Sequence, residues 1–395
     1  MSEGSSNIKD LVGSEDAYQK SNSFSDFVLA PEKFEKVRGK LQAALERLDS
    51  NIGELSEDDA LAKKAASCLL GKEKADGDVD FSLTPNVAGD LSRISDQDYD
   101  RYLRYRYRYE VYPVIRKLDE FPPCVQIEPT SMCNLRCVFC YQTDSRLTHR
   151  KEGHMGRMPL ERFKTLIDQL EGKCEAVTLA SRGEPTLCKD LPEMLKYMSG
   201  KFLAAKVNTN ATKLTEDLCH ALLSTEGLTV VFSADAAEEP LYSQLRVNSD
   251  LETVLKNIGM FNDIRTKHYK NSNILTRVSG VRVNSQQNID DMTKVWGDMV
   301  DQIAFVDYNP WENSYDRDPV GEDRPCSDLW RRMFVWWDGK VNPCDVDYRS
   351  HLQVGNVDNG GIGALWHSED YDRLRNNHLE GSRGKVSPCN RCTFI

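Results

Sequence analysis

The sequence has little positive charge and no long apolar run, and each absence excludes a class of protein. Its 51 Lys and Arg residues are outnumbered by 62 Asp and Glu residues, which leaves a net charge of −11. Nucleic-acid backbones are bound mainly by Lys and Arg, so no nucleic-acid partner is expected. No uninterrupted apolar stretch approaches the roughly 18 residues of a membrane helix, and the N-terminus lacks the basic-then-apolar pattern of a signal peptide. We therefore expect a soluble, cytoplasmic protein with no membrane partner.

The 395 residues leave room for two or three domains, and residues 1–115 form the first region. Apolar residues recur every three or four positions over 31–49, which predicts a helix, whereas the Gly-, Asp- and Ser-rich stretch 69–98 predicts a loop. Another helix is predicted over 99–113, because four tyrosines share one face and would pack on the next domain: Tyr102, Tyr105, Tyr109 and Tyr112. We expect a helical, partly flexible N-terminal extension.

Residues 116–310 form the second region, in which short β-rich runs alternate with helical runs. Six such alternations predict an α/β fold with a parallel sheet curled into part of a barrel, short of the eight units of a closed TIM barrel. The expected strands are 124–130, 176–181, 204–210, 229–236, 275–283 and 302–309. After residue 310 the alternation stops, and two apolar runs around Asp338-Gly339 predict a hairpin in a small separate domain, 311–395.

Seven of the twelve cysteines fall into two groups with ligand-like spacing, which in a reducing cytosol indicates metal binding or catalysis rather than disulfides. Cys133, Cys137 and Cys140 form C-x3-C-x2-C directly after the first expected strand, at the strand end where barrels of this type carry their active sites. Three thiolates without a fourth nearby suit a [4Fe-4S] cluster with one open iron. The alternative is a zinc site with a distant fourth ligand.

The second group lies in the last region and has the spacing C-x17-C-x44-C-x2-C: Cys326, Cys344, Cys389 and Cys392. Four cysteine ligands would fill a [4Fe-4S] cluster and leave no iron open, which favours electron transfer or a structural role. A structural zinc is the alternative, because four thiolates also suit that ion.

The first group resembles the signature of the radical S-adenosylmethionine (radical SAM) enzymes, C-x3-C-x-aromatic-C, with Phe139 at the aromatic position. The resemblance covers roughly residues 120–310 and implies a partial (β/α)6 barrel. It also implies that the open iron binds SAM, and that an electron donor such as flavodoxin or ferredoxin reduces the cluster. SAM is then cleaved to methionine and a 5′-deoxyadenosyl radical, which abstracts a hydrogen atom from the substrate.

The resemblance also implies SAM contacts at successive strand ends. Gly183, Glu184 and Pro185 match the family's Gly-Gly-Glu-Pro motif, which receives the SAM ammonium group, although Arg182 replaces the first glycine. The other contacts implied are to the ribose and carboxylate from Asn208, Asn210, Ser233 and Asp235, to the carboxylate from Arg246, and to the adenine beside Val281. A purely structural role is the alternative for each single polar residue.

The second group, with its hairpin glycine and its final P-C-x-x-C, resembles the SPASM and twitch extensions of radical SAM enzymes. A full SPASM domain continues with further cysteines, whereas this chain ends three residues after Cys392. The resemblance therefore implies the shorter twitch type, with one auxiliary [4Fe-4S] cluster and two clusters in the whole chain.

A filled auxiliary cluster predicts that an electron leaves the substrate radical, so that the net reaction is a two-electron oxidation. Family members with a twitch domain oxidise an aminocyclitol alcohol in this way. Such a reaction needs a proton acceptor, and the candidates by position are Asp307, Tyr308 and Glu312, in a polar and aromatic stretch that joins the barrel to the last domain. We expect a hydroxylated, sugar- or cyclitol-like small molecule, whose anionic group Arg182 and Arg282 would face.

Two other functions stay open at this point. The first is a peptide or protein maturase of the peptide-modifying, epimerase or activase type. Residues 1–115 show no wing hairpin, which argues against the leader-binding domain of many peptide-modifying members, and an epimerase would need a hydrogen donor such as Cys124 or Cys188. The second is a metal-binding scaffold without catalytic activity.

Overall fold

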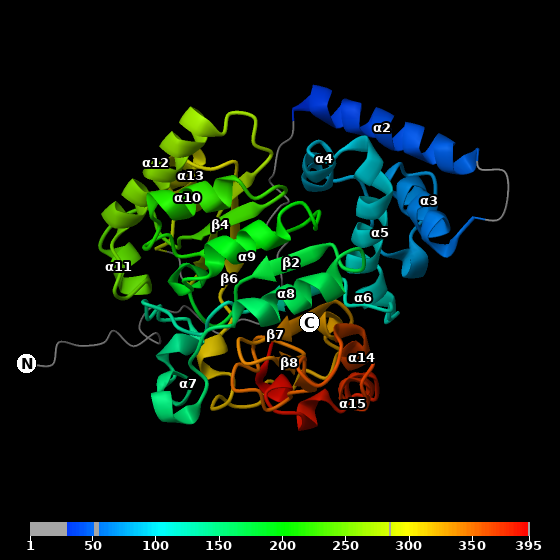
Figure 1. Cartoon of the computed structure of the whole chain (residues 1–395). Coiled ribbons are helices and arrows are strands. Elements are labelled where there is room, and N and C mark those ends of the chain that lie inside the picture. Colours follow the sequence, from blue (N-terminus) through cyan, green and yellow to red (C-terminus); the bar gives the residue numbers. More distant parts are fainter. Residues whose placement is uncertain (1–29, 51–54, 284–285, 394–395) are drawn as a thin grey trace, which may run out of the picture.

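A single sheet contains all the strands of the described residues, which are 30–50, 55–283 and 286–393 of this computed structural model (Figure 1). Its first six strands are parallel neighbours in chain order. They are β1 (Cys124–Ile127), β2 (Ala176–Leu179), β3 (Lys206–Thr209), β4 (Thr229–Ser233), β5 (Leu275–Arg282) and β6 (Gln302–Asp307). Each lies within a run predicted from the sequence, and the sheet stays open at β6, so the expected partial barrel is confirmed.

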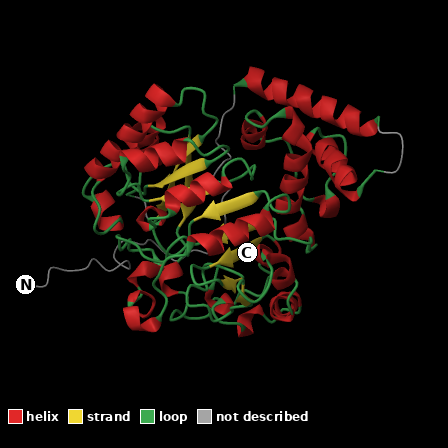
Figure 2. Ribbon diagram, viewed as in Figure 1, coloured by secondary structure: helices red, strands yellow, loops and turns green. Residues whose placement is uncertain are grey.

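The connecting helices pack side by side over the outer face of the sheet (Figure 2). They are α8 (Leu160–Leu170), α9 (Leu191–Met198), α10 (Glu216–Leu223), α11 (Leu241–Leu245), α12 (Leu251–His268) and α13 (Ile289–Gly297), and the short α7 (Ser145–Thr148) follows the first cysteine group. Helix α8 shows why they dock this way. Its buried residues Phe163, Leu166, Ile167 and Leu170 form one apolar stripe, which joins the main hydrophobic core.

The N-terminal region forms a helical unit beside the barrel (Figure 1). Its helices are α2 (Pro31–Asp49), α3 (Glu57–Leu69), α4 (Pro85–Leu91), α5 (Tyr99–Glu110) and α6 (Tyr112–Ile115). The loop predicted over 69–98 is wrong in part, because α4 lies within it, begins at Pro85 and is capped by Thr84. The core of this unit includes Cys124 and Ala176, so the unit packs on the amino ends of β1 and β2. The part of the extension before residue 30, and residues 51–54, lie outside the described residues.

The C-terminal region extends the barrel's sheet rather than standing apart from it. It contains β7 (Arg332–Val335), β8 (Lys340–Asn342), β9 (Gly355–Asn356), α14 (Ile362–Trp366) and α15 (Glu369–Leu379). The predicted hairpin is confirmed as β7–β8, and Gly339 closes its turn with a φ of +84°. Strand β7 pairs in parallel with β1 and thereby covers an edge that would otherwise expose its backbone groups, while the domain boundary expected at residue 311 stays a prediction. No helix among the described residues combines the length and apolarity needed to cross a membrane.

Candidate functional site

The first cysteine group lies in the loop after β1, where the structure brings the three thiols together. The pKa of Cys133 is raised to about 12, mainly by burial and also by the negative charges of Glu184 and Cys137. Backbone N–H groups already point at the sulfurs: Leu135 donates to Cys133 Sγ at 3.4 Å and Gln142 donates to Cys140 Sγ at 3.5 Å. Such donors stabilise a thiolate once a metal has displaced its proton.

Arg246 lies beside this group, close to Cys137. One of its terminal nitrogens is 4.0 Å from Cys137 Sγ, and its Nε forms a buried ion pair with Asp235 at 2.5 Å. The second oxygen of Asp235 accepts a hydrogen bond from Val281 N at 2.6 Å. Three residues predicted to contact SAM are therefore joined to one another next to a cysteine of the first group, and Arg246 is oriented by a carboxylate of the protein.

The loop after β2 is fixed tightly against the loop after β1. A Cβ on Gly183 would lie 2.3 Å from the carbonyl oxygen of Thr130 and 2.6 Å from that of Met132, so only glycine fits. The Glu184 carboxylate accepts hydrogen bonds at 2.7 Å from Thr209 Oγ1 and from Asn210 N, and burial raises its pKa. Its Oε1 also accepts two hydrogen bonds from Thr186, whereas Oε2 accepts one, from the Asn210 N–H, among the described residues. That oxygen keeps capacity for the ammonium group that the sequence assigns to it.

The remaining predicted SAM contacts differ in how far the protein itself engages them. Asn208 has a buried Oδ1 without a hydrogen-bond partner among the described residues, whereas the Asn210 amide is engaged by Asn134 and Thr212. Ser233 ends β4 and is partly buried beside β5. Phe139 packs against the main core. Asn208 is therefore better placed than Asn210 to bind a ligand.

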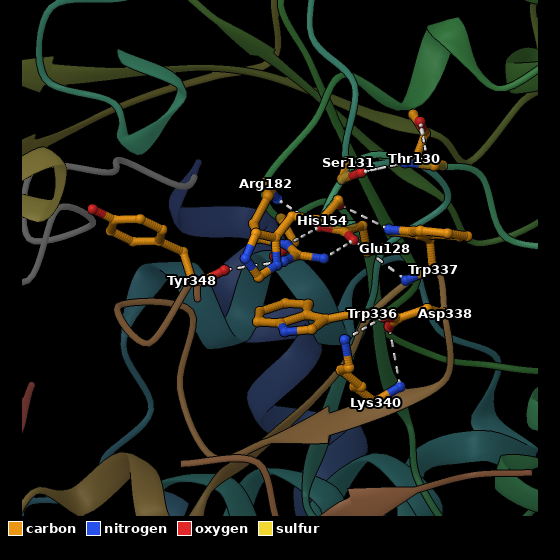
Figure 3. A network of polar contacts seen from close by, with 12 residues as sticks. Glu128, Thr130, Ser131, His154, Arg182, Trp336, Trp337, Asp338, Lys340 and Tyr348 are labelled. Atoms are coloured by element: carbon orange, nitrogen blue, oxygen red, sulfur yellow. Dashed lines mark hydrogen bonds and ion pairs between the residues drawn. The ribbon is translucent and has the colours of Figure 1, made fainter. Parts of the chain in front are cut away.

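Arg182 does not face a substrate, and that prediction is wrong. Its side chain is 1% exposed and forms a two-pronged ion pair with Glu128, whose side chain is 0% exposed, at 2.6 and 2.7 Å (Figure 3). It also donates to the carbonyl of Tyr348 at 3.0 Å and lies over the ring of Trp336 at 4.4 Å. Because both Tyr348 and Trp336 belong to the C-terminal region, this pair connects the loop after β2 to that region. Arg282 pairs with Asp307 at a half-exposed position.

The sequence reasoning missed Glu128 as the partner of Arg182. Glu128 directly follows β1 and Arg182 follows the neighbouring β2. Two opposite charges at the adjacent ends of parallel strands were the available signal, because such ends meet at one edge of the sheet.

The four late cysteines also come together. The pKa of Cys326 is raised to about 12, mainly by burial. Charge on Cys392 contributes to the raised pKa values of Cys326, Cys344 and Cys389. Arg383 holds the last pair in place by donating to the carbonyls of Cys389 and Cys392 at 3.3 and 2.8 Å. The protein therefore fixes this segment through its own hydrogen bonds, in addition to any bonds to a metal.

The described residues offer no site for a single metal ion, because no three His, Cys, Asp or Glu side chains among them converge closely enough to hold one. The four cysteines of a [4Fe-4S] cluster would each bind a different iron. An iron–sulfur cluster in each cysteine group stays the prediction.

The candidate proton acceptors lie at the end of β6, which is Asp307, and on the segment that follows it. Tyr308 donates to Glu312 Oε1 at 2.5 Å, whereas Glu312 Oε2 is buried without a hydrogen-bond partner among the described residues. Burial raises the pKa of Glu312. Next to it, Trp311 packs against a cluster of buried residues that includes Tyr141, and Cys140 packs against the same cluster. Asp307 is neutralised by Arg282, so Glu312 is the strongest of the three candidates.

An open parallel barrel with three cysteines after β1, joined to a unit with four more, defines an iron–sulfur enzyme of the partial-barrel class. Residues 127–284 match the model of the radical SAM superfamily, and residues 326–393 match that of the SPASM domain, an iron-sulfur cluster-binding domain. The chain belongs to the radical SAM superfamily and carries a SPASM domain. The two family matches support SAM and iron–sulfur clusters as the cofactors. The twitch type with a single auxiliary cluster stays a prediction.

Known relatives differ in the substrates that their names give. The chain is 25% identical over 322 residues to mycofactocin maturase MftC of Mycobacterium tuberculosis, covering 71% of this chain and 81% of that protein. It is 24% identical over 288 residues to the S-adenosyl-L-methionine-dependent 2-deoxy-scyllo-inosamine dehydrogenase of Niallia circulans, covering 70% and 95%. The crystal structure of Streptococcus suis SuiB bound to precursor peptide SuiA matches with a TM-score of 0.55 at 15% identity, covering 88% and 89%, which supports the fold. The chain spans only 24% and 44% of the lengths of two further curated relatives.

Proposed function

We propose that the chain is a radical SAM oxidoreductase that oxidises an alcohol of a sugar- or cyclitol-like small molecule to a ketone. The observation that carries the proposal is Glu312, whose Oε2 is buried without a hydrogen-bond partner among the described residues and whose neighbour Trp311 packs against the same aromatic cluster as Cys140. A dehydrogenation needs a base in this position, because the hydroxyl proton must leave as the C–H hydrogen is removed. A dehydrogenase of a cyclitol amine is among the relatives that the chain covers over most of their length.

The residues that would hold the cofactors are those already described. Cys133, Cys137 and Cys140 would hold the first [4Fe-4S] cluster, and the four late cysteines would hold the auxiliary one. When bound, SAM and the two clusters supply hydrogen-atom abstraction and an acceptor for the second electron. The proposal includes a flavodoxin- or ferredoxin-type donor that supplies the electron for SAM cleavage.

The chain's own residues perform the remaining work. Glu312 Oε2 accepts the hydroxyl proton, and the Tyr308 hydroxyl fixes the carboxylate through Oε1. The raised pKa of Glu312 brings it closer to neutral pH, where a general base works best. Gly183 and Glu184 shape the SAM side of the site, and Asp235 orients Arg246 beside Cys137.

Substitution of Glu312 by Gln tests the role of the base. With anaerobically reconstituted enzyme and dithionite, E312Q should still cleave SAM to 5′-deoxyadenosine but lose ketone formation by roughly 100-fold or more, since general bases contribute about that much. The matched control is Glu380→Gln, at an exposed position after α15, which should behave as wild type. Ketone formation by E312Q at the wild-type rate would remove Glu312 from the mechanism.

A peptide maturase is the second candidate, favoured by the similarity to mycofactocin maturase over 71% of the chain. The regular elements of the described residues before β1 are helices, which offers no wing hairpin for a leader peptide. Neighbouring genes separate the two candidates. Glycosyltransferase or nucleotide-sugar genes would favour the small molecule, and a short precursor-peptide gene would favour the maturase.

A further inference from the structure

A large cavity lies at the amino ends of the barrel strands, opposite the end that carries Cys133. It has a volume of about 970 Å³, which is at the upper end of the range for small-molecule sites. The first residues of β1 to β5 line one side, and helix α5 of the N-terminal unit lines the other with Tyr102, Tyr105 and Tyr109. We call this space the amino-end cavity. The predicted tyrosine face of α5 thus forms one of its walls.

The deep wall of the amino-end cavity is cationic. Lys206 on β3, Arg277 on β5 and Arg332 on β7 all line it. Arg277 donates to the amide oxygen of Gln302 at 3.0 Å, and Arg332 donates to the hydroxyl of Tyr109 at 2.8 Å. Both of these acceptors are neutral, and Arg332 Nε also lies 3.9 Å from Asp328 Oδ1, which balances part of the charge of Arg332.

The carboxylates that line the cavity are paired with arginines or lie at its exposed rim. Asp90 pairs with Arg93 at 2.7 Å, and Glu110 pairs with Arg106. Asp98 pairs with Arg101 at 2.9 Å. The other two, Asp80 and Glu226, are exposed. None of these carboxylates forms an ion pair with Lys206.

Lys206 is a cation of this wall that no carboxylate of the described residues balances through an ion pair. Among the described residues, no hydrogen bond or ion pair engages its ammonium group. The pKa of Lys206 is lowered from 10.5 to about 8, mainly by burial and also by the like charges of Arg277 and Arg332, whereas Tyr109 and Cys124 act in the opposite direction. A buried ammonium group without a partner is unfavourable, and a bound anion would relieve both the desolvation and the repulsion.

The amino-end cavity and the SAM side of the barrel share one inward face. Lys206 and Asn208 are two residues apart on β3 and both line the cavity, so they point the same way, roughly 7 Å apart along the strand. Asn208 is also the predicted SAM contact with a buried, unpartnered Oδ1. A ligand anchored at Lys206 therefore extends toward the reaction end of the same barrel.

We propose that the amino-end cavity binds a phosphate group of the substrate, through Lys206 together with Arg277 and Arg332, with the tyrosine wall against its ring. This inference rests on the proposed function for the identity of the ligand as the substrate. It replaces the role first given to Arg182 and Arg282, which are engaged by Glu128 and Asp307. Arginine and lysine together suit phosphate, because the guanidinium groups bind two oxygens and the ammonium group adds a point charge.

Isothermal titration calorimetry with phenyl phosphate tests the cavity without SAM or reductant. The reconstituted full-length protein is titrated at about pH 8, where a phosphate monoester is fully dianionic because its second pKa is about 6. Phenol serves as the neutral analogue and benzoate as the carboxylate analogue. The variants are Lys206→Met and the matched control Lys196→Met, an exposed lysine of α9.

We expect saturable binding of phenyl phosphate, weaker binding of benzoate, and none of phenol. The substitution K206M should weaken the binding of phenyl phosphate by roughly 10- to 100-fold, which is the usual contribution of a hydrogen bond to a charged group. The control K196M should leave this affinity unchanged. Titration in two buffers of different ionisation enthalpy should show uptake of up to about half a proton by wild type, lost in K206M. Thermal unfolding of K206M separates lost binding from lost folding.

Three outcomes would overturn the proposal. They are equal binding of phenol and phenyl phosphate, tighter binding of benzoate, and phenyl phosphate binding by K206M at wild-type strength. Failure of wild type to cleave SAM would instead contradict the proposed function, and leaves the calorimetric result intact.

Discussion

Replacement of Arg182 by Met should destabilise the protein strongly, because it leaves a carboxylate buried without its counter-ion. Glu128 would lose two charge-assisted hydrogen bonds, at 2.6 and 2.7 Å. It would keep only the backbone N–H groups of residue 182, at 3.1 Å, and of Trp337, at 3.3 Å. The same substitution removes the donor to Tyr348 and the cation over Trp336, so contact with the C-terminal region is lost as well.

The expected magnitude follows from the burial of both partners. Removal of one member of a buried ion pair typically costs about 3–5 kcal/mol in the free energy of unfolding, whereas replacement of both by neutral groups is often nearly neutral. R182M should therefore lose about 4 kcal/mol. The double variant E128Q/R182M should recover at least about half of that loss, because it leaves no buried charge.

Denaturant unfolding under anaerobic conditions measures the four corners of this double-mutant cycle. The matched control is Arg373→Met, which breaks an exposed pair with Asp370 and should change stability by less than about 0.5 kcal/mol. The reasoning is refuted if R182M lies within 1 kcal/mol of wild type, or if E128Q/R182M is no more stable than R182M.

Three further predictions concern Lys206, Gly183 and the late cysteines. A pKa lowered from 10.5 to about 8 costs roughly 3 kcal/mol while both states are protonated, so K206M should be more stable than wild type below pH 8. Between about pH 8 and 10.5 the unfolded state binds more protons than the folded state, so the stability of wild type should rise with pH relative to that of K206M. Thermal unfolding across that range measures the rise. No such rise would be seen if the lysine were well solvated. Gly183→Ala should weaken SAM binding by roughly tenfold or more in equilibrium dialysis, since the added Cβ meets fixed backbone. The control Gly259→Ala, at a position with open space in α12, should leave SAM binding unchanged. Equal SAM affinities of the two variants would contradict the tight packing of the loop at Gly183. Cys389→Ala should spare SAM cleavage but stop product formation, both followed by chromatography. Product formation by C389A at the wild-type rate would rule out electron transfer to the late cysteine group.

The strands, the two cysteine groups and the hairpin were predictable because their signals are local. Alternation of β-rich and helical runs gave all six barrel strands, and spacing alone brought out both sets of cysteines. The direction of Arg182 was not predictable from its own neighbourhood, because its partner Glu128 lies 54 residues away. The pairing of β7 with β1 joins segments about 200 residues apart, and no local pattern encodes such a pairing.

The amino-end cavity was likewise beyond local signals. Its cations come from β3, β5 and β7, and its tyrosine wall comes from α5. In the sequence Lys206 is a single charge at the start of a strand, and only the fold places Arg277 and Arg332 close to it.

We propose that the chain holds two clusters, of which the late cysteines hold the auxiliary one. Metal and sulfide analysis of the triple variant Cys133→Ala/Cys137→Ala/Cys140→Ala tests it most directly. After anaerobic reconstitution, wild type should contain about eight irons per chain and the triple variant about four, with matching sulfide. A triple variant without iron, or with one zinc in its place, would contradict the account.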